Sequence, residues 1–406
     1  MTHARRRFLI LAATLFVALG AGAGASRAPL AILSAGPTGE VASLGDAAEI
    51  RVEFSEPMVP LGRTPAAVTV PFFAIAPAVK GTFRWAGTTT LIFTPAAPLP
   101  FATRYTVRIT AAATAASGNT LSAPYTFTFT TPTVRLLGAG WYREGGRVDG
   151  QIVVGLQFNQ PVSAAGAAPH IGLAYAPHEW QAPAYPPAAL ARLKAVAADA
   201  VAAFERKTAA TLEVAGRDGP IAFAPAAKWD TDRFPASDHL VILRSTSAPP
   251  PESWVAVNVA PAIRGLAGRA TPGEAQSYTL QLEPAFFVEG FACHSQCDPS
   301  DWNPIRFRVP TRVAPVAKAL SVADITSATA PVKPASAPAE RDEADATPAV
   351  TLEDAGFAAQ PAARRYAVTL APSLQSADGQ TLGYAWMGVV ENWHAGAFTS
   401  FGDGHG

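Results

Sequence analysis

Apolar and polar residues alternate in short segments along the chain, and this pattern predicts β-strands. The segments 49–54, 105–110 and 125–131 place an apolar or aromatic side chain at nearly every second position, which puts these side chains on one face of a sheet. Turn signals rich in Gly, Pro and Asn separate the segments. Several short strands within about 100 residues are typical of an Ig-like sandwich, which we therefore predict over residues 29–131.

One strand pattern is repeated, which indicates a repeated module. Residues 51–59 combine an alternating strand that carries a Phe with a polar step and a Pro; residues 154–162 repeat this loosely, and residues 305–310 echo it faintly. Proline ends each strand because it has no N–H to donate to the sheet. The repeat predicts one β-module used about three times. Chains of such modules usually bind, brace or space other domains rather than catalyse.

Two further modules are expected after the first, a second β-sandwich over 132–284 and a third over 285–406. Within the second, residues 187–211 are rich in Ala and follow a helical period. The apolar stripe of this predicted helical insertion comprises Leu190, Leu193, Val196, Val201 and Phe204. Within the third, residues 327–348 lack apolar periodicity, so we expect a disordered insertion there. The predicted fold class is mainly β, with tandem Ig-like sandwiches and a small helical insertion in the second module.

The first 28 residues are organised like a signal peptide. A basic start at Arg5, Arg6 and Arg7 precedes an apolar stretch over 8–19 and a small-residue stretch over 20–28. The apolar stretch is shorter than the roughly 20 residues that a membrane span needs. We expect the leader to be cleaved and the mature protein to be exported to the periplasm or outside the cell, without a membrane span. The start also loosely resembles a twin-arginine signal, so the export route stays open.

The overall composition indicates which classes of binding partner the chain does not favour. Apolar residues make up 49% of the 406 residues, which is enough for real cores, and charged residues make up only 15%. The formal net charge is zero, so nothing global favours nucleic acid or an anionic membrane as a partner.

Two cysteines, Cys293 and Cys297, lie close together in the sequence. In an oxidising compartment such a pair most simply forms a disulfide that fixes a loop, and this is our prediction. A metal site would need ligands beyond the adjacent His294, and the spacing differs from a Cys-x-x-Cys redox motif.

Familiar catalytic motifs are missing from the sequence. It contains no Gly-x-Ser-x-Gly elbow, no His-Glu-x-x-His zinc motif and no Walker-type phosphate loop. Residues weighed as metal ligands, and interpreted instead as loop and turn residues, are His394, Asp403, His405, Asp230, Asp232, Asp298 and Asp301. Residues weighed as a binding platform, and interpreted instead as core, are Trp85, Trp254 and Trp302. We therefore predict no catalytic, cofactor or metal site and no enzymatic activity.

Two resemblances to bacterial families add to this interpretation. The phrase at 54–59, followed by 91–95, resembles SbsA-type Ig-like domains. The C-terminal runs 382–384, 391–394 and 397–406 are similar to the N-terminal region of bacterial alpha-2-macroglobulin-like proteins. The second resemblance covers nearly the whole mature chain, and the paired cysteines between the second and third modules suit it.

The resemblance implies macroglobulin-type sandwiches in an exported, non-enzymatic trap for proteases. Full members of that family are longer and carry a bait region and often a Cys-x-Glu-Gln thioester. The nearest string here is Cys293-His294-Ser295-Gln296, in which Ser295 stands where the family has Glu, so covalent trapping is not implied. The chain is expected to be a fragment, truncated at its C-terminus and lacking the bait and thioester regions.

The predicted function is thus a non-catalytic exported scaffold region of a bacterial alpha-2-macroglobulin-like protease inhibitor. Its expected partners are proteases, engaged through missing C-terminal domains, or proteins of the cell envelope. The main alternative is a stand-alone Ig-like surface protein that serves in adhesion or as a spacer. A third possibility is an accessory module of a secreted hydrolase.

Overall fold

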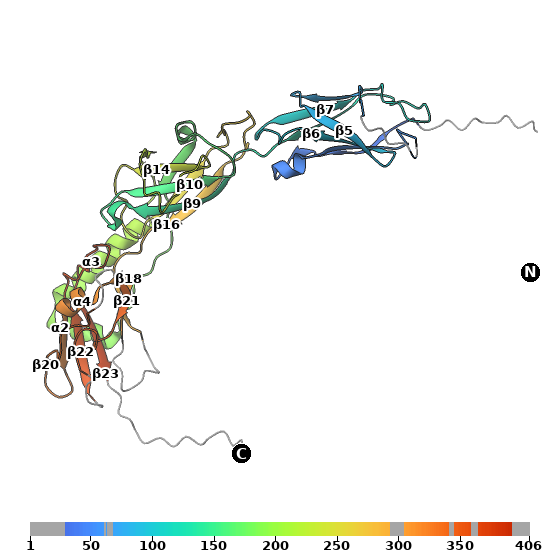
Figure 1. Cartoon of the computed structure of the whole chain (residues 1–406). Helices are drawn as coiled ribbons and strands as arrows, with labels where there is room; N and C mark the ends of the chain where they lie inside the picture. Colours follow the sequence, from blue (N-terminus) through green and yellow to red (C-terminus); the bar gives the residue numbers. More distant parts are fainter. Residues whose placement is uncertain are drawn as a thin grey trace, which may run out of the picture. The chain divides into compact units, whose positions relative to one another are not determined.

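The computed structural model describes residues 29–60, 62, 68–292, 304–340, 345–358 and 364–391. The fold is mainly β and consists of Ig-like sandwiches (Figure 1). The chain divides into two compact units. The first is formed largely by residues up to Phe129, and the second by residues from Thr130 onward together with Glu40–Leu44 and Leu99–Arg104. Within the described ranges, none of the helices combines the length and hydropathy that a bilayer crossing requires.

The first sandwich consists of two four-stranded sheets. One sheet has the order β1 (Ile32–Gly36), β3 (Ile50–Phe54), β6 (Thr90–Pro95), β5 (Gly81–Ala86), and the other has the order β2 (Gly39–Glu40), β8 (Tyr125–Thr130), β7 (Arg104–Ile109), β4 (Phe73–Ala76). A short 3-10 helix, η1, spans Leu44–Ala47. The alternation in β3 buries Ile50, Val52 and Phe54, each at most 1% exposed, as the sequence pattern predicts.

Aromatic side chains from both sheets fill the interior of the first sandwich. The ring of Phe93 lies 4.9 Å from that of Phe83 and 5.4 Å from that of Phe73, measured between centroids. A Cβ at Gly81 would meet the Phe93 ring at 2.5 Å, so this strand position has room only for glycine. The Gly-Thr-Phe sequence at the start of β5 therefore lets strand and ring approach closely.

The second sandwich also has two four-stranded sheets, which enclose one continuous core. One has the order β13 (Phe223–Pro225), β14 (Leu240–Ser245), β10 (Ile152–Phe158), β9 (Leu136–Arg143); the other has the order β12 (Pro220–Ile221), β11 (Ile171–Tyr175), β15 (Trp254–Val259), β16 (Gln276–Gln281). Short helical turns are η2 (Glu144–Gly146), α1 (Ala164–Ala167) and η3 (Ala168–His170). Phe158 is fully buried in this core.

The third sandwich pairs a three-stranded sheet with a four-stranded sheet. The first has the order β17 (Val288–Phe291), β18 (Ile305–Thr311), β21 (Thr347–Val350), and the second has the order β20 (Ala330–Val332), β19 (Leu320–Asp324), β22 (Arg365–Leu370), β23 (Trp386–Glu391). Helix α4 (Val313–Ala319) connects β18 to β19. The core contains the fully buried rings of Phe286, Phe287, Tyr366 and Tyr384.

Two helices occupy the stretch where the sequence predicts a helical insertion. Helix α2 (Pro187–Val196) starts with Pro at its first position, where the missing N–H costs nothing. Helix α3 (Ala198–Ala215) follows after a break at Ala197, whose φ of −157° and ψ of 68° are not helical. Val196, just before this break, is 62% exposed and does not belong to the predicted apolar stripe.

The segment 327–348, for which the sequence predicts a disordered insertion, takes part in backbone pairing. In its described part, β20 pairs with β19 and the start of β21 pairs with β18. The backbone N–H of Ala339 also donates to the carbonyl of Asp354, at 2.8 Å. Backbone hydrogen bonds hold this segment while its side chains stay largely exposed, so it leaves no apolar periodicity for a sequence pattern to reveal.

Candidate functional site

The predicted disulfide residues, Cys293 and Cys297, lie outside the described residues, so their pairing stays a prediction. The same holds for further residues that the sequence singles out, namely His294, Asp298, Asp301, Trp302, His394, Asp403 and His405. Among the described residues, no three His, Cys, Asp or Glu side chains come close enough together to hold a metal ion.

The remaining candidates have structural partners. Asp230 accepts hydrogen bonds through Oδ1 from the backbone N–H groups of Asp232 and Arg233, at 3.0 and 3.3 Å, which is the turn role interpreted from the sequence. Trp85 is 8% exposed and packs on Phe54, with ring centroids 6.2 Å apart. Trp254 stacks on His178 at 4.3 Å. Trp85 and Trp254 thus pack against neighbours within the fold.

The helical insertion packs on the core of the third sandwich. The Phe204 ring of α3 lies 5.1 Å from Tyr384 and 6.1 Å from Phe287. Leu193 of α2 and Val201 of α3 form a smaller cluster with Met387 of β23. Figure 1 shows the two helices, in light green, beside the orange and red strands of the third sandwich. Helices from the second module in sequence therefore cover part of the third in space.

Lys207 fixes α3 to this surface. Its Nζ donates to the carbonyls of Thr381 and Leu382, at 2.9 and 2.8 Å, and lies 5.0 Å from the Phe287 ring centroid and 5.8 Å from that of Tyr384. Burial lowers the pKa of Lys207 from its ordinary 10.5 to about 8 because a desolvated ammonium is less favourable. The carbonyl oxygens and ring faces favour the charged form.

Tyr185, just before α2, covers the edge of β23. Its Oη donates to the carbonyl of Ala385 at 3.3 Å and accepts from the N–H of Met387 at 3.1 Å. Burial raises the pKa of Tyr185 to about 12, so the phenol stays protonated and able to donate. Unpaired edge groups of a sheet invite association with other chains, and Tyr185 removes two of them.

The segment that connects the second and third sandwiches is held from both sides. Glu252, 7% exposed, accepts from the N–H of Ala285 at 2.8 Å and lies 3.1 Å from Arg308. Gln380 accepts from the N–H of Phe286 at 2.8 Å and donates to the carbonyl of Pro284 at 3.0 Å. These bonds satisfy buried backbone groups of the connection, which water would otherwise have to reach.

We call this assembly the brace: α2, α3, Tyr185, Lys207, Glu252 and Gln380 with the partners just described. Sequence reasoning located the helices but none of these polar contacts. One signal was available for Lys207, because it follows Phe204 by three residues and so lies on the same helix face. For Glu252 and Gln380 the sequence offers no signal, because their partners are backbone groups distant along the chain.

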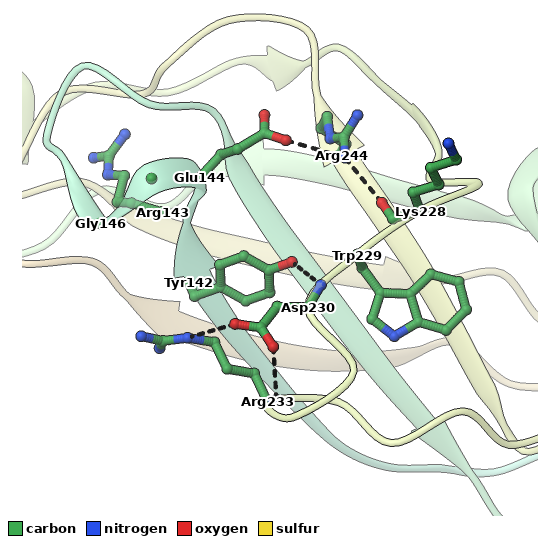
Figure 2. A pocket seen from close by; sticks show the side chains of 10 residues that line it. Tyr142, Arg143, Glu144, Gly146, Lys228, Trp229, Asp230, Arg233 and Arg244 are labelled. Carbon is green, nitrogen blue, oxygen red and sulfur yellow. Dashed lines mark hydrogen bonds and ion pairs between the residues drawn. The ribbon is translucent and has the colours of Figure 1, made fainter.

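A cleft of about 560 Å³ opens on the second sandwich, beside the end of β9. Figure 2 shows its lining residues, which come from β9, η2, β14 and the loop between β13 and β14. The loop is anchored by Phe234, whose ring lies where a Cβ on Gly155 would come within 3.0 Å. Gly155 pairs with Gly140 across β10 and β9, so two facing glycines make the slot for this ring. The sequence reasoning did not identify this cleft.

Hydrogen bonds and ion pairs fix the positions of the side chains that line the cleft. Tyr142 accepts through Oη from the backbone N–H of Asp230 at 2.9 Å, and Asp230 lies 3.4 Å from Nε of Arg233. Arg244 donates through Nη2 to the carbonyl of Lys228 at 2.9 Å and lies 3.2 Å from Glu144. Both carboxylates of the lining are therefore engaged, while several N–H donors of the arginines remain.

In the comparisons with known proteins, the first sandwich has the clearest match. Residues 26–131 match the model of a bacterial Ig-like domain. A search of curated proteins found no match for the chain. Among solved structures, a part of Escherichia coli alpha-2-macroglobulin spanning domains MG0-NIE-MG1 is similar at 15% identity, covering 88% of this chain and 96% of that one, with a TM-score of 0.21.

Two other solved structures are similar at lower identity. Titin domains I67–I69 show 8% identity over 90% of this chain and 98% of that chain, with a TM-score of 0.18. The S-layer protein rSbsC shows 9% identity over 92% of this chain and 55% of that chain, with a TM-score of 0.17. At TM-scores this low the three neighbours do not bear on function. The chain is thus similar to a bacterial Ig-like domain over residues 26–131. The description of its other two sandwiches rests on the structure alone.

Proposed function

We propose that this chain is a non-catalytic, exported scaffold that holds its second and third β-sandwiches in a fixed arrangement. The brace is the observation that carries this proposal. Its polar groups bind backbone atoms across the connection between the second and third sandwiches, and its aromatic groups join α3 to the third core. A flexible tether between independent domains needs none of these contacts, whereas a rigid spacer depends on them.

Within this role, we further propose that the scaffold belongs to a bacterial alpha-2-macroglobulin-like protease inhibitor. The C-terminal sequence runs that resemble that family support the proposal, as does the match of residues 26–131 to a bacterial Ig-like domain. Such an inhibitor acts sterically, so a stiff pair of sandwiches would set the position of the parts that enclose a protease. The partners would be proteases or proteins of the envelope.

Limited proteolysis of the full chain tests the scaffold. The connection around Pro284 to Phe286 is buried and hydrogen-bonded, so a broad-specificity protease should leave it intact under native conditions. Replacing both anchors, Glu252→Ala with Gln380→Ala, should produce cleavage between the second and third sandwiches at least about tenfold faster. The exposed Glu274→Ala, a matched control, should behave like the parent. Equal protection of parent and double variant would contradict the scaffold.

Incubation with proteases tests the inhibitor proposal separately. The protein purified from its exporting cell should shield a bound protease from protein substrates while leaving small peptide substrates accessible, because exclusion is steric. The recombinant 406-residue chain alone should show neither this shielding nor any hydrolysis of its own. If the native protein instead leaves proteases fully accessible but adheres to cells or envelope material, the alternative of an Ig-like surface protein, favoured by the same Ig-like match, replaces the inhibitor.

A further inference from the structure

We propose that the cleft of Figure 2 binds a carboxylate group, with Arg244, Arg233 and Lys228 as its recognition residues. The proposal is independent of the brace, since none of these residues belongs to it. The cleft's volume of about 560 Å³ falls within the range of small-molecule sites, roughly 300–1,000 Å³.

The charge of the lining favours an anion. Four cations, Arg143, Lys228, Arg233 and Arg244, face two carboxylates, Glu144 and Asp230. Arg143 is neutralised by Glu283 behind the cleft, at 2.5 Å, and both of these side chains are largely buried. The three remaining cations still exceed the two carboxylates, so an added carboxylate completes the balance.

The carboxylates already in the cleft leave donors for a ligand. Asp230 is engaged by its own loop, with Oδ1 on two backbone N–H groups and Oδ2 on Arg233. Glu144 is 49% exposed and meets Arg244 at a single pair of atoms, 3.2 Å apart. A monodentate, half-exposed pair of this kind contributes little and is easily exchanged.

Arg244 provides the most specific evidence. Its Nε is buried and has no hydrogen-bond partner among the described residues, although buried N–H groups are almost always paired. The guanidinium fork offers parallel N–H groups that match the two oxygens of a carboxylate. The buried Nε shows that the protein itself leaves this guanidinium underpaired. The Arg244 side chain is 33% exposed, so a ligand carboxylate would bind at the terminal nitrogens of the guanidinium.

The cleft is held in shape before any ligand arrives. Phe234 fits the slot over Gly155, the indole N–H of Trp229 donates to the Phe234 carbonyl at 2.7 Å, and Tyr142 holds the N–H of Asp230. Figure 2 shows Trp229 and Tyr142 as the aromatic side chains beside the charged groups. A preformed site avoids the cost of ordering a loop on binding. Two sources of a small carboxylate fit this chemistry, an acidic sugar and an acidic amino acid.

Titration calorimetry of the full chain at low salt tests the proposal. The probes are sodium glucuronate and N-acetylglutamate, each compared with its neutral counterpart, glucose and N-acetylglutamine α-amide. We expect at least one carboxylate to bind at least about tenfold more tightly than its neutral counterpart, and added salt to weaken that binding. Preference for glucuronate assigns an acidic sugar as the source, and preference for N-acetylglutamate assigns an acidic amino acid.

Variants locate the binding in the cleft. Arg244→Gln should weaken carboxylate binding at least about tenfold. Because Arg244 also contacts the Lys228 carbonyl, a second variant, Lys228→Gln with Arg233→Gln, changes only exposed side chains and should weaken binding several-fold in a folded protein. Arg264→Gln, an exposed cation of the same sandwich outside the cleft, is the control and should bind like the parent. Failure of both carboxylates to bind, equal binding of the neutral probes, or unchanged binding in the double variant would overturn the proposal.

Discussion

Lys207 is a cation held by two carbonyl oxygens and aromatic rings rather than by a carboxylate in the described part of the chain. Its stem lies on the apolar face of α3, so the charge is partly desolvated where α3 meets the third sandwich. From sequence, a lone lysine on a helix face is ordinarily a solvated residue. Its helix position could be predicted, but its neighbours could not, because Thr381 and Leu382 approach only when the third sandwich has folded.

The lowered pKa of Lys207 makes stability depend on pH. The folded protein releases this proton near pH 8 and the unfolded chain near pH 10.5, so between these values the unfolded state binds more protons and stability rises with pH. We expect the unfolding free energy of the parent, relative to Lys207→Met, to increase by about 2 kcal/mol over this range. Denaturant titrations at several pH values measure this difference. Lys194→Met, an exposed control on α2, should show no such trend, and a flat difference for Lys207→Met would contradict the burial of the charge.

At the scale of elements, the strands with strict alternation could be predicted, and those without it could not. The segments containing β3, β7 and β8 carry buried side chains at every second position and were visible as patterns. Strand β20 lies at a sheet edge with mostly exposed side chains, so its apolar pattern is weak. The loop over the cleft was hidden for another reason. Its anchor, Phe234, packs against Gly140 and Gly155, which are distant from it along the chain. The positions of the two glycines in the sequence do not indicate which aromatic ring packs on them.

The glycine slot predicts a clear element-scale effect. Gly155→Ala would place a Cβ 3.0 Å from the Phe234 ring, so the ring must move by a few tenths of an ångström, and with it the Trp229 side chain that is hydrogen-bonded to the Phe234 carbonyl. We expect a loss of about 1–3 kcal/mol in unfolding free energy, as for other overpacked sites, together with a change in tryptophan fluorescence. Gly172→Ala in β11 is the matched control, since nothing lies within 4 Å of the added Cβ. Equal behaviour of the two variants would show that Phe234 does not occupy the slot.

At the scale of the whole molecule, the mainly β class and the Ig-like character of the first module followed from strand pattern and turns, and the match at residues 26–131 supports the latter. What the pattern could not show is that the helical insertion packs on the following sandwich. Helical period identifies an apolar face but says nothing of the surface that it covers. The contact follows from shape and from aromatic rings contributed by segments far apart in sequence.

This packing predicts that the second and third sandwiches unfold together. Phe204→Ala removes a half-buried ring that contacts Tyr185, Phe287 and Tyr384, so it should cost about 2 kcal/mol. It should also separate the calorimetric transition of the second unit into two. Leu212→Ala removes a side chain of α3 that is 54% exposed and should leave the transition single. Two transitions already present within the second unit of the parent, in addition to that of the first unit, would contradict the coupling of the two sandwiches.

The hydrogen bond between Tyr185 and Met387 joins residues 202 positions apart, and this separation has a consequence for biosynthesis. A ribosome releases α2 and α3 long before it completes β23, so their apolar faces emerge without the surface that later covers them. During that interval the apolar faces of the helices stay exposed, and the helical insertion cannot reach its final packing. Newly made protein should therefore acquire its native form only after the last described strand has been synthesised.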